Sequence, residues 1–227
     1  MATYTSQYPP AQSSTYVKAT SYYSADNYPH FTTDPTKPLT GSFAGNAWLS
    51  GLNKDTDQRF HIDLGSAKII RRIYYENIHH LGGSTDGGAQ NFTLWGSNTA
   101  GDFADLVYVN DGTWTELDVS QNTLDRHVDL DQADPKFITV TNSTAYRYYA
   151  LKFADNYGNV YFMGVRRIEL QTEDGYVPPD IDIGMPASDR GTFLGSYTFV
   201  NKGNPANANG RITSVEIWAY TDILFCW

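Results

Sequence analysis

The 227-residue chain lacks several features that would narrow its class at once. It has one cysteine, Cys226, so it cannot form an internal disulfide. It has no apolar run near the ~20 residues that a membrane-spanning helix needs, so we expect no membrane insertion. Its amino terminus has no basic region followed by an apolar stretch, so no signal peptide is visible. The net charge of −9 would repel phosphate backbones, and we expect no nucleic-acid partner.

Tyrosine and glycine are what the chain has in abundance. Its 17 Tyr and 19 Gly against 3 Met favour an all-β fold rich in turns. Tyr suits half-buried pleated surfaces, and Gly supplies left-handed turn conformations. Residues 59–66 alternate apolar Phe60, Ile62 and Leu64 with polar residues before a Gly, which predicts a half-buried strand ending in a turn.

Strand signals of this kind follow one another from residue 16 to residue 171. Apolar residues in 113–134 do not hold a 3.6-residue period, so we predict strand, loop and strand there rather than a helix. Many short strands without helical crossovers predict an antiparallel jelly-roll β-sandwich. The other predicted strands are 16–20, 68–75, 91–98, 106–109, 114–117, 137–140, 147–153 and 165–170.

The order and spacing of 59–66, 91–98, 147–153 and 165–170 resemble the discoidin domain, also called the coagulation-factor type C domain. They are similar also to its bacterial relatives among carbohydrate-binding modules. The resemblance covers residues 16–172 and implies a galactose-binding-like β-sandwich that acts in recognition and not as an enzyme. No nucleophile-elbow, phosphate-binding or metal-hydrolase motif points to catalysis.

In the discoidin family, loops at one end of the sandwich form the recognition surface. The matching segments here are 26–30, 77–90 and 155–161. Sugar recognition needs an aromatic face for the apolar side of the ring, with fixed donors and acceptors for the hydroxyls. The alternative interpretation is a solvated Gly-rich turn beside core tyrosines. We predict Tyr157 or Tyr161 as the aromatic face, and His79, His80, Asp86 and Asn159 as the polar contacts.

The resemblance also implies a calcium ion near the start of the sandwich. The family holds it with backbone carbonyls, an Asp after the first strand and a Glu in the last strand. Here these are Asp34 and Glu169, with the loop ending at Asn46. Oxygen donors on a turn-rich loop suit the six to eight ligands of calcium. The family's usual Asp-Gly is Asp34-Pro35 in this chain, and a loop held by turn hydrogen bonds alone is the alternative.

The two flanks of the sandwich differ from it in composition. Residues 1–15 are polar and aperiodic and predict a flexible arm, and 173–180 predict a linker. Residues 181–227 carry strand signals but are too few for a core of their own. Three roles stay open for this β-rich extension: it packs on the sandwich, it pairs with another subunit in a homo-oligomer, or it is the truncated start of a second domain.

Two functions follow from these observations. The first is a non-catalytic module that binds carbohydrate or a cell surface in adhesion, with a glycan as its partner. The alternative is a structural or adhesive appendage subunit of a phage, virion or surface filament, whose arm and extension pair with neighbouring subunits. Both predict a location that is extracellular or on a virion or cell surface.

Overall fold

The strands are arranged in a single curled antiparallel sheet. The computed structural model describes residues 2–178, and in that part ten strands follow the order β1-β10-β5-β8-β7-β6-β9-β4-β2, with β3 beside β10. The strands are β1 Tyr4–Gln7, β2 Val17–Ala19, β3 Trp48–Leu49, β4 Gln58–Lys68, β5 Arg72–Asn77, β6 Phe92–Ser97, β7 Thr115–Val119, β8 Lys136–Thr141, β9 Tyr146–Phe153 and β10 Gly164–Glu173. The helical elements are η1 Ala25–Asn27, η2 Pro29–Thr33, η3 Thr85–Gly87 and α1 Ala100–Ala104.

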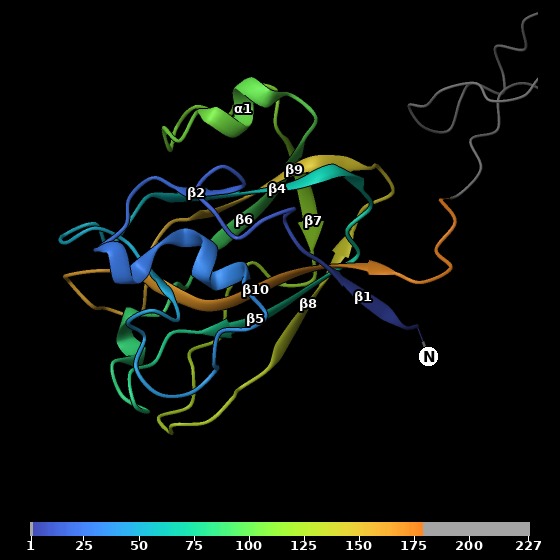
Figure 1. Ribbon diagram of the computed structural model, residues 1–227. Helices are drawn as coiled ribbons and strands as arrows, with labels where there is room; N and C mark the ends of the chain where they lie inside the picture. The colour runs from blue at the N-terminus through green and yellow to red at the C-terminus, as the bar shows by residue number, and fades with distance from the viewer. Residues whose placement is uncertain (1, 179–227) are drawn as a thin grey trace, which may run out of the picture. The chain divides into compact units, whose positions relative to one another are not determined.

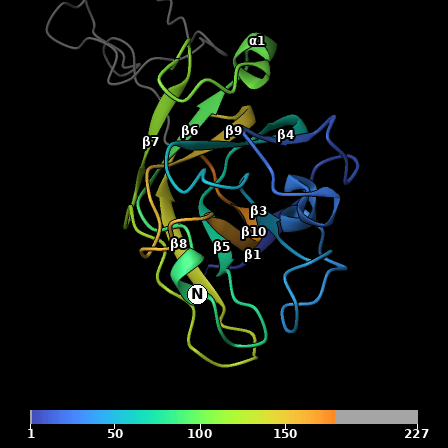
Figure 2. The same cartoon turned by 90° about the vertical axis from the view of Figure 1, so that its left-hand side faces the viewer.

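The sheet folds over on itself to give two layers (Figures 1 and 2). One layer holds β1, β10, β5 and β8 with β3, and the other holds β2, β4, β9, β6 and β7. They are joined where β7 pairs with β8, through Asp118 opposite Thr141 and Val119 opposite Val140. The predicted all-β antiparallel sandwich is therefore confirmed for the described residues.

The alternation in β4 explains how the core forms. Phe60, Ile62 and Leu64 turn inward and are buried, while β9 lies beside them with Leu151 opposite Phe60. The ring of Trp48 packs on Phe60 at 5.3 Å between centroids. Each such side chain contributes about 1.5–3 kcal/mol when it leaves water, which makes this central cluster the main source of stability.

The amino-terminal residues are not the flexible arm that the sequence predicted. Residues 4–7 form β1, which pairs with β10 along its length, from Tyr4 opposite Glu173 to Gln7 opposite Leu170. Side chains reinforce the pairing, since the Arg72 guanidinium lies 3.8 Å from the centroid of the Tyr4 ring. The prediction was wrong because an edge strand can be held by its ladder without an apolar pattern.

Two other segments differ from their predictions. Residues 106–109 are a loop and not a strand, because the Arg59 guanidinium gathers the carbonyls of Val107 (2.9 Å) and Tyr108 (3.2 Å). The short helix α1 precedes this loop and covers the outer side of the β4–β9–β6 layer, where Phe103 packs with Tyr148. In 113–134 only the first of the two predicted strands forms, as β7.

The carboxyl-terminal boundary falls late in the predicted linker. Strand β10 runs to Glu173, and residues up to Val177 belong to one compact unit. The predicted extension at 181–227 lies outside the described residues. None of the helices described here is both long and apolar enough to cross a membrane.

Candidate functional site

The loops predicted to form the recognition surface lie on the side of the sandwich away from the amino terminus (Figure 1). They carry η1, η2 and η3 together with the connection from β9 to β10. Two of the loops pack directly on each other. The Asn159 amide donates to the Asp86 carboxylate (3.3 Å), and the Tyr157 backbone N–H donates to the Gly88 carbonyl (3.3 Å).

Glycine permits this close approach. A Cβ on Gly87 would lie 2.5 Å from the Phe162 ring, and one on Gly88 would lie 2.8 Å from the Asn77 side chain. Contacts that short do not occur without a shift of the neighbour. Gly87 thus lets the 77–90 loop pack against Phe162 of the neighbouring loop, and Gly88 lets it pack on its own Asn77, so the loop is more than a solvated turn.

The two candidate tyrosines lie in different surroundings. Tyr157 is partly buried and donates its hydroxyl to the Leu124 carbonyl (2.7 Å), which fixes its ring. Tyr161 is 56% exposed, and its backbone N–H donates to the Asn159 side chain (2.9 Å). Of the two, Tyr161 is therefore the exposed residue, and its backbone is bonded to Asn159, the partner of Asp86.

The two candidate histidines have contacts other than that pair. His79 is fully buried, stacks on His127 at 4.1 Å between centroids and donates from Nε2 to the Leu39 carbonyl (3.0 Å). Burial lowers the pKa of His79, which keeps the ring neutral. His80 packs on Phe43 at 4.6 Å. As the structure places it, His79 cannot be the polar contact that the sequence predicted.

The three side chains predicted to hold calcium have other partners. The Asp34 carboxylate accepts from the backbone N–H (3.0 Å) and hydroxyl (2.7 Å) of Thr36. The Glu169 carboxylate accepts from Ser6 (2.6 Å) and pairs with Arg167 (3.2 Å). The Asn46 amide donates to carbonyls of its own turn. These side chains do not form a ligand set as they lie, and no group of three or more acidic, His or Cys side chains in the described part fits a metal. Calcium binding stays a prediction.

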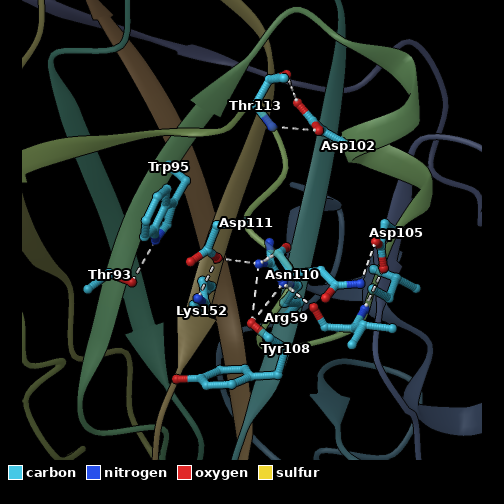
Figure 3. A network of polar contacts seen from close by, with 12 residues as sticks. Arg59, Thr93, Trp95, Asp102, Asp105, Tyr108, Asn110, Asp111, Thr113 and Lys152 are labelled. Carbon is cyan, nitrogen blue, oxygen red and sulfur yellow. Dashed lines mark hydrogen bonds and ion pairs between the residues drawn. The ribbon is translucent and has the colours of Figure 1, made fainter.

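A polar network that the sequence analysis missed lies on the outer face of the β4–β9–β6 layer (Figure 3). The Asp111 carboxylate accepts from Lys152 (2.6 Å) and Arg59 (2.6 Å). The Lys152 ammonium lies 5.1 Å from the Trp95 ring centroid and 4.9 Å from that of Tyr108. One sign of this network was present in the sequence: the alternation in 91–98 places Trp95 on the opposite face of the strand from Leu94.

The charged side chains of this network are paired with one another, so they hold the chain in place and are not free to bind a ligand. The Arg59 side chain is fully buried and Lys152 is nearly so, and both already bind Asp111. Arg59 also bonds to the Asn110 carbonyl. The network therefore fixes the 99–114 excursion on the sheet. The loop surface around Tyr161, Asn159 and Asp86 remains the better candidate for a ligand.

Comparisons with known proteins bear on the fold. No family model and no curated protein matches the chain. Among solved structures, truncated AlyQ with CBM32 and alginate lyase domains has a TM-score of 0.52 at 16% identity, covering 81% of this chain and 37% of that one. The CBM32-5 module from Clostridium perfringens, in complex with GalNAc-β-1,3-galactose, has a TM-score of 0.48 at 16% identity, covering 68% and 92%.

A third solved structure is chitosan-binding module 1 of a chitosanase/glucanase from Paenibacillus sp. IK-5, with a TM-score of 0.46 at 19% identity, covering 68% and 92%. At these identities the likeness concerns the fold and not the ligand. Together with the two-layer sheet described above, the likeness to truncated AlyQ shows that residues 2–178 share the β-sandwich fold found in that structure.

Proposed function

We propose that the described domain is a non-catalytic carbohydrate-binding module whose ligand surface is formed by Tyr161, Asn159 and Asp86. The observation that carries the proposal is the Asp86–Asn159 hydrogen bond, with the exposed Tyr161 bonded through its backbone to the same Asn159. It joins two loops 73 residues apart into one polar surface with an aromatic neighbour. The CBM32-like fold supports the same function.

Each residue has a distinct role in this proposal. The Tyr161 ring offers an apolar face to the C–H side of a sugar ring. The Asn159 amide and the Asp86 carboxylate supply a donor and acceptors for hydroxyls, and their mutual bond orients both before a sugar arrives. Tyr157, tied to Leu124, keeps the 155–161 loop in position. His80, beside Phe43, lies on the same 77–90 loop as Asp86.

Such a module would act outside the cell or at a cell surface, where polysaccharides are presented, and would serve adhesion. The appendage-subunit alternative gains no support from the described residues. Its arm is β1 within the sandwich, and its β-rich extension lies outside them.

A glycan array with the full chain, followed by calorimetry on the best ligand, tests the proposal. We expect Tyr161→Ala to lower affinity about two- to tenfold, since one stacking aromatic contributes about 0.5–1.5 kcal/mol. Asn159→Ala should lower it to a similar extent.

The matched control is Phe137→Ala, because Phe137 on β8 is exposed to a similar extent (51%) but does not belong to the loop surface. Its affinity should equal that of the wild type. An array with no glycan bound, or a Tyr161→Ala variant that binds like Phe137→Ala, would overturn the proposal.

A further inference from the structure

Backbone carbonyls from two loops converge on one buried arginine of β10. Arg166 Nη2 donates to the carbonyls of His79 (2.6 Å) and Gly41 (2.9 Å), and Nη1 donates to that of Thr40 (3.2 Å). A longer contact reaches the Pro38 carbonyl (3.4 Å). The Arg166 side chain is fully buried, so the loop wraps it completely.

The neighbouring arginine points to the same loop. Arg167 Nη2 donates to the Lys37 carbonyl (2.6 Å). Consecutive residues of a regular strand point to opposite faces of the sheet. The register of β10 against β5 shifts between Val165 and Arg167, and such an irregularity turns the side chains so that both guanidinium groups reach the 37–41 segment.

The charge of Arg166 is balanced by dipoles more than by a direct ion pair. Its four partners are carbonyl oxygens, and the nearest acidic influences are Asp131 and Glu76. Burial, with the like charge of Arg167, outweighs the effect of these two acids and lowers the pKa of Arg166 to about 10, so the group is cationic at neutral pH. Asp131 also accepts from the Gly41 backbone N–H (2.6 Å), which fixes the loop from its other side.

Carbonyl oxygens gathered around a positive charge are the arrangement that an oxygen-liganded metal ion produces. Here the cation belongs to the chain. The carboxylates that a metal would need are used elsewhere, because Glu169 pairs with Arg167 and Asp34 closes a turn with Thr36.

We propose that the positive charge of Arg166 takes the place of a metal ion between the 37–41 segment and His79. The structure of both loops then does not depend on a divalent metal. The guanidinium ties both loops to β10, so the side of the sandwich that carries the candidate ligand surface is ordered without calcium. This inference does not depend on the proposed carbohydrate binding.

Thermal unfolding of the full chain in calcium, in magnesium and in a chelator tests the proposal, with calorimetric titration of calcium alongside. We expect the wild-type Tm to be the same in all three, and no heat of calcium binding. Arg166→Met should lower Tm by roughly 5–10 °C, because it leaves carbonyls buried and unpaired. Arg166→Lys should recover only part of this loss, since an ammonium lacks the planar fork that reaches four acceptors.

The control is Arg126→Met, which removes a half-exposed arginine from the surface and should leave Tm nearly unchanged. Calcium that raises the wild-type Tm, a chelator that lowers it, or an Arg166→Met variant as stable as Arg126→Met would each overturn the proposal. If Arg166→Met does not fold, the wild-type titration and Arg166→Lys decide the matter.

Discussion

His61 shows how a single residue links the stability of this fold to pH. Its side chain is fully buried under α1, and Nδ1 donates to the Phe103 carbonyl (3.1 Å). Burial, with the nearby charge of Arg59, lowers the pKa of His61 to about 4. Between pH ~6.5 and ~4 the unfolded chain therefore binds a proton that the folded chain does not.

The unfolding free energy should accordingly fall as pH drops through this window, by up to about 3 kcal/mol for this group. Denaturant titrations from about pH 7 to about pH 4 measure the slope. In His61→Gln the slope should be shallower by about one proton, while the lowered pKa values of His30 and His79 keep some slope in both proteins. Equal slopes in the two proteins would contradict the assignment.

Residue roles were the hardest part to predict from the sequence. Asp86, Asn159 and Tyr161 were expected at one surface, and the structure brings them near one another. His79 was expected there too, but its partner His127 follows 48 positions later, and no local pattern reveals a stack between them. Arg166 was missed for the same reason, since its acceptors are carbonyls, and any residue can supply a carbonyl.

Among the elements, β10 and β3 meet at a position where only glycine fits. Gly164 lies opposite Leu49, and a Cβ there would come within 2.6 Å of the Trp48 carbonyl oxygen and 2.5 Å of Leu49. Gly164→Ala should lower the unfolding free energy by about 1–3 kcal/mol, because the backbone must move. Gly101→Ala in α1, where the nearest atom is 3.9 Å away, should be neutral or slightly stabilising. Denaturant unfolding compares them, and equal stability of the two variants would refute the argument.

Strand β1 gives a second test at this scale. Its pairing with β10 includes the Ser6 hydroxyl bond to Glu169 (2.6 Å) and the contact of Tyr4 with Arg72. Deleting residues 2–7 should lower the unfolding free energy by roughly 2–4 kcal/mol, at about 1 kcal/mol for each lost hydrogen bond. A deletion variant with unchanged stability, measured by the same unfolding, would restore the flexible-arm interpretation.

The sequence predicted elements well where one face of a strand is buried. β4, β6, β8 and β9 lie within two residues of their predicted ranges at both ends, and β10 runs three residues further than predicted, to Glu173. β1 was not predicted because it is an edge strand. Its residues are all partly exposed or exposed, so it has no apolar alternation. Residues 106–109 have the apolar and β-branched composition of a strand but form a loop, in which the buried Arg59 binds the carbonyls of Val107 and Tyr108.

For the molecule as a whole, the net charge of −9 governs which glycans can approach. Sulfated or uronic-acid glycans should bind more tightly as salt is added, since salt screens repulsion beyond a Debye length of about 10 Å at 0.1 M. A neutral glycan should show no such change. Calorimetry with two glycans of equal length at low and high salt measures the difference. An anionic glycan whose affinity falls with salt would contradict this and indicate a local basic site.

The place of β10 in the sheet also has a consequence for synthesis on the ribosome. This strand, the last of the described residues, pairs with β1, β3 and β5, so β1 and β3 have no strand neighbour, and β5 has only β8, until residue 173 has been made. A chain that grows from its amino terminus must leave β1 and β3 unpaired and one edge of β5 open, and then close the layer in one late step. Long-range pairing of this kind is slow to form. Slowing translation ahead of β10 should therefore prolong the exposed state without producing a stable half-domain.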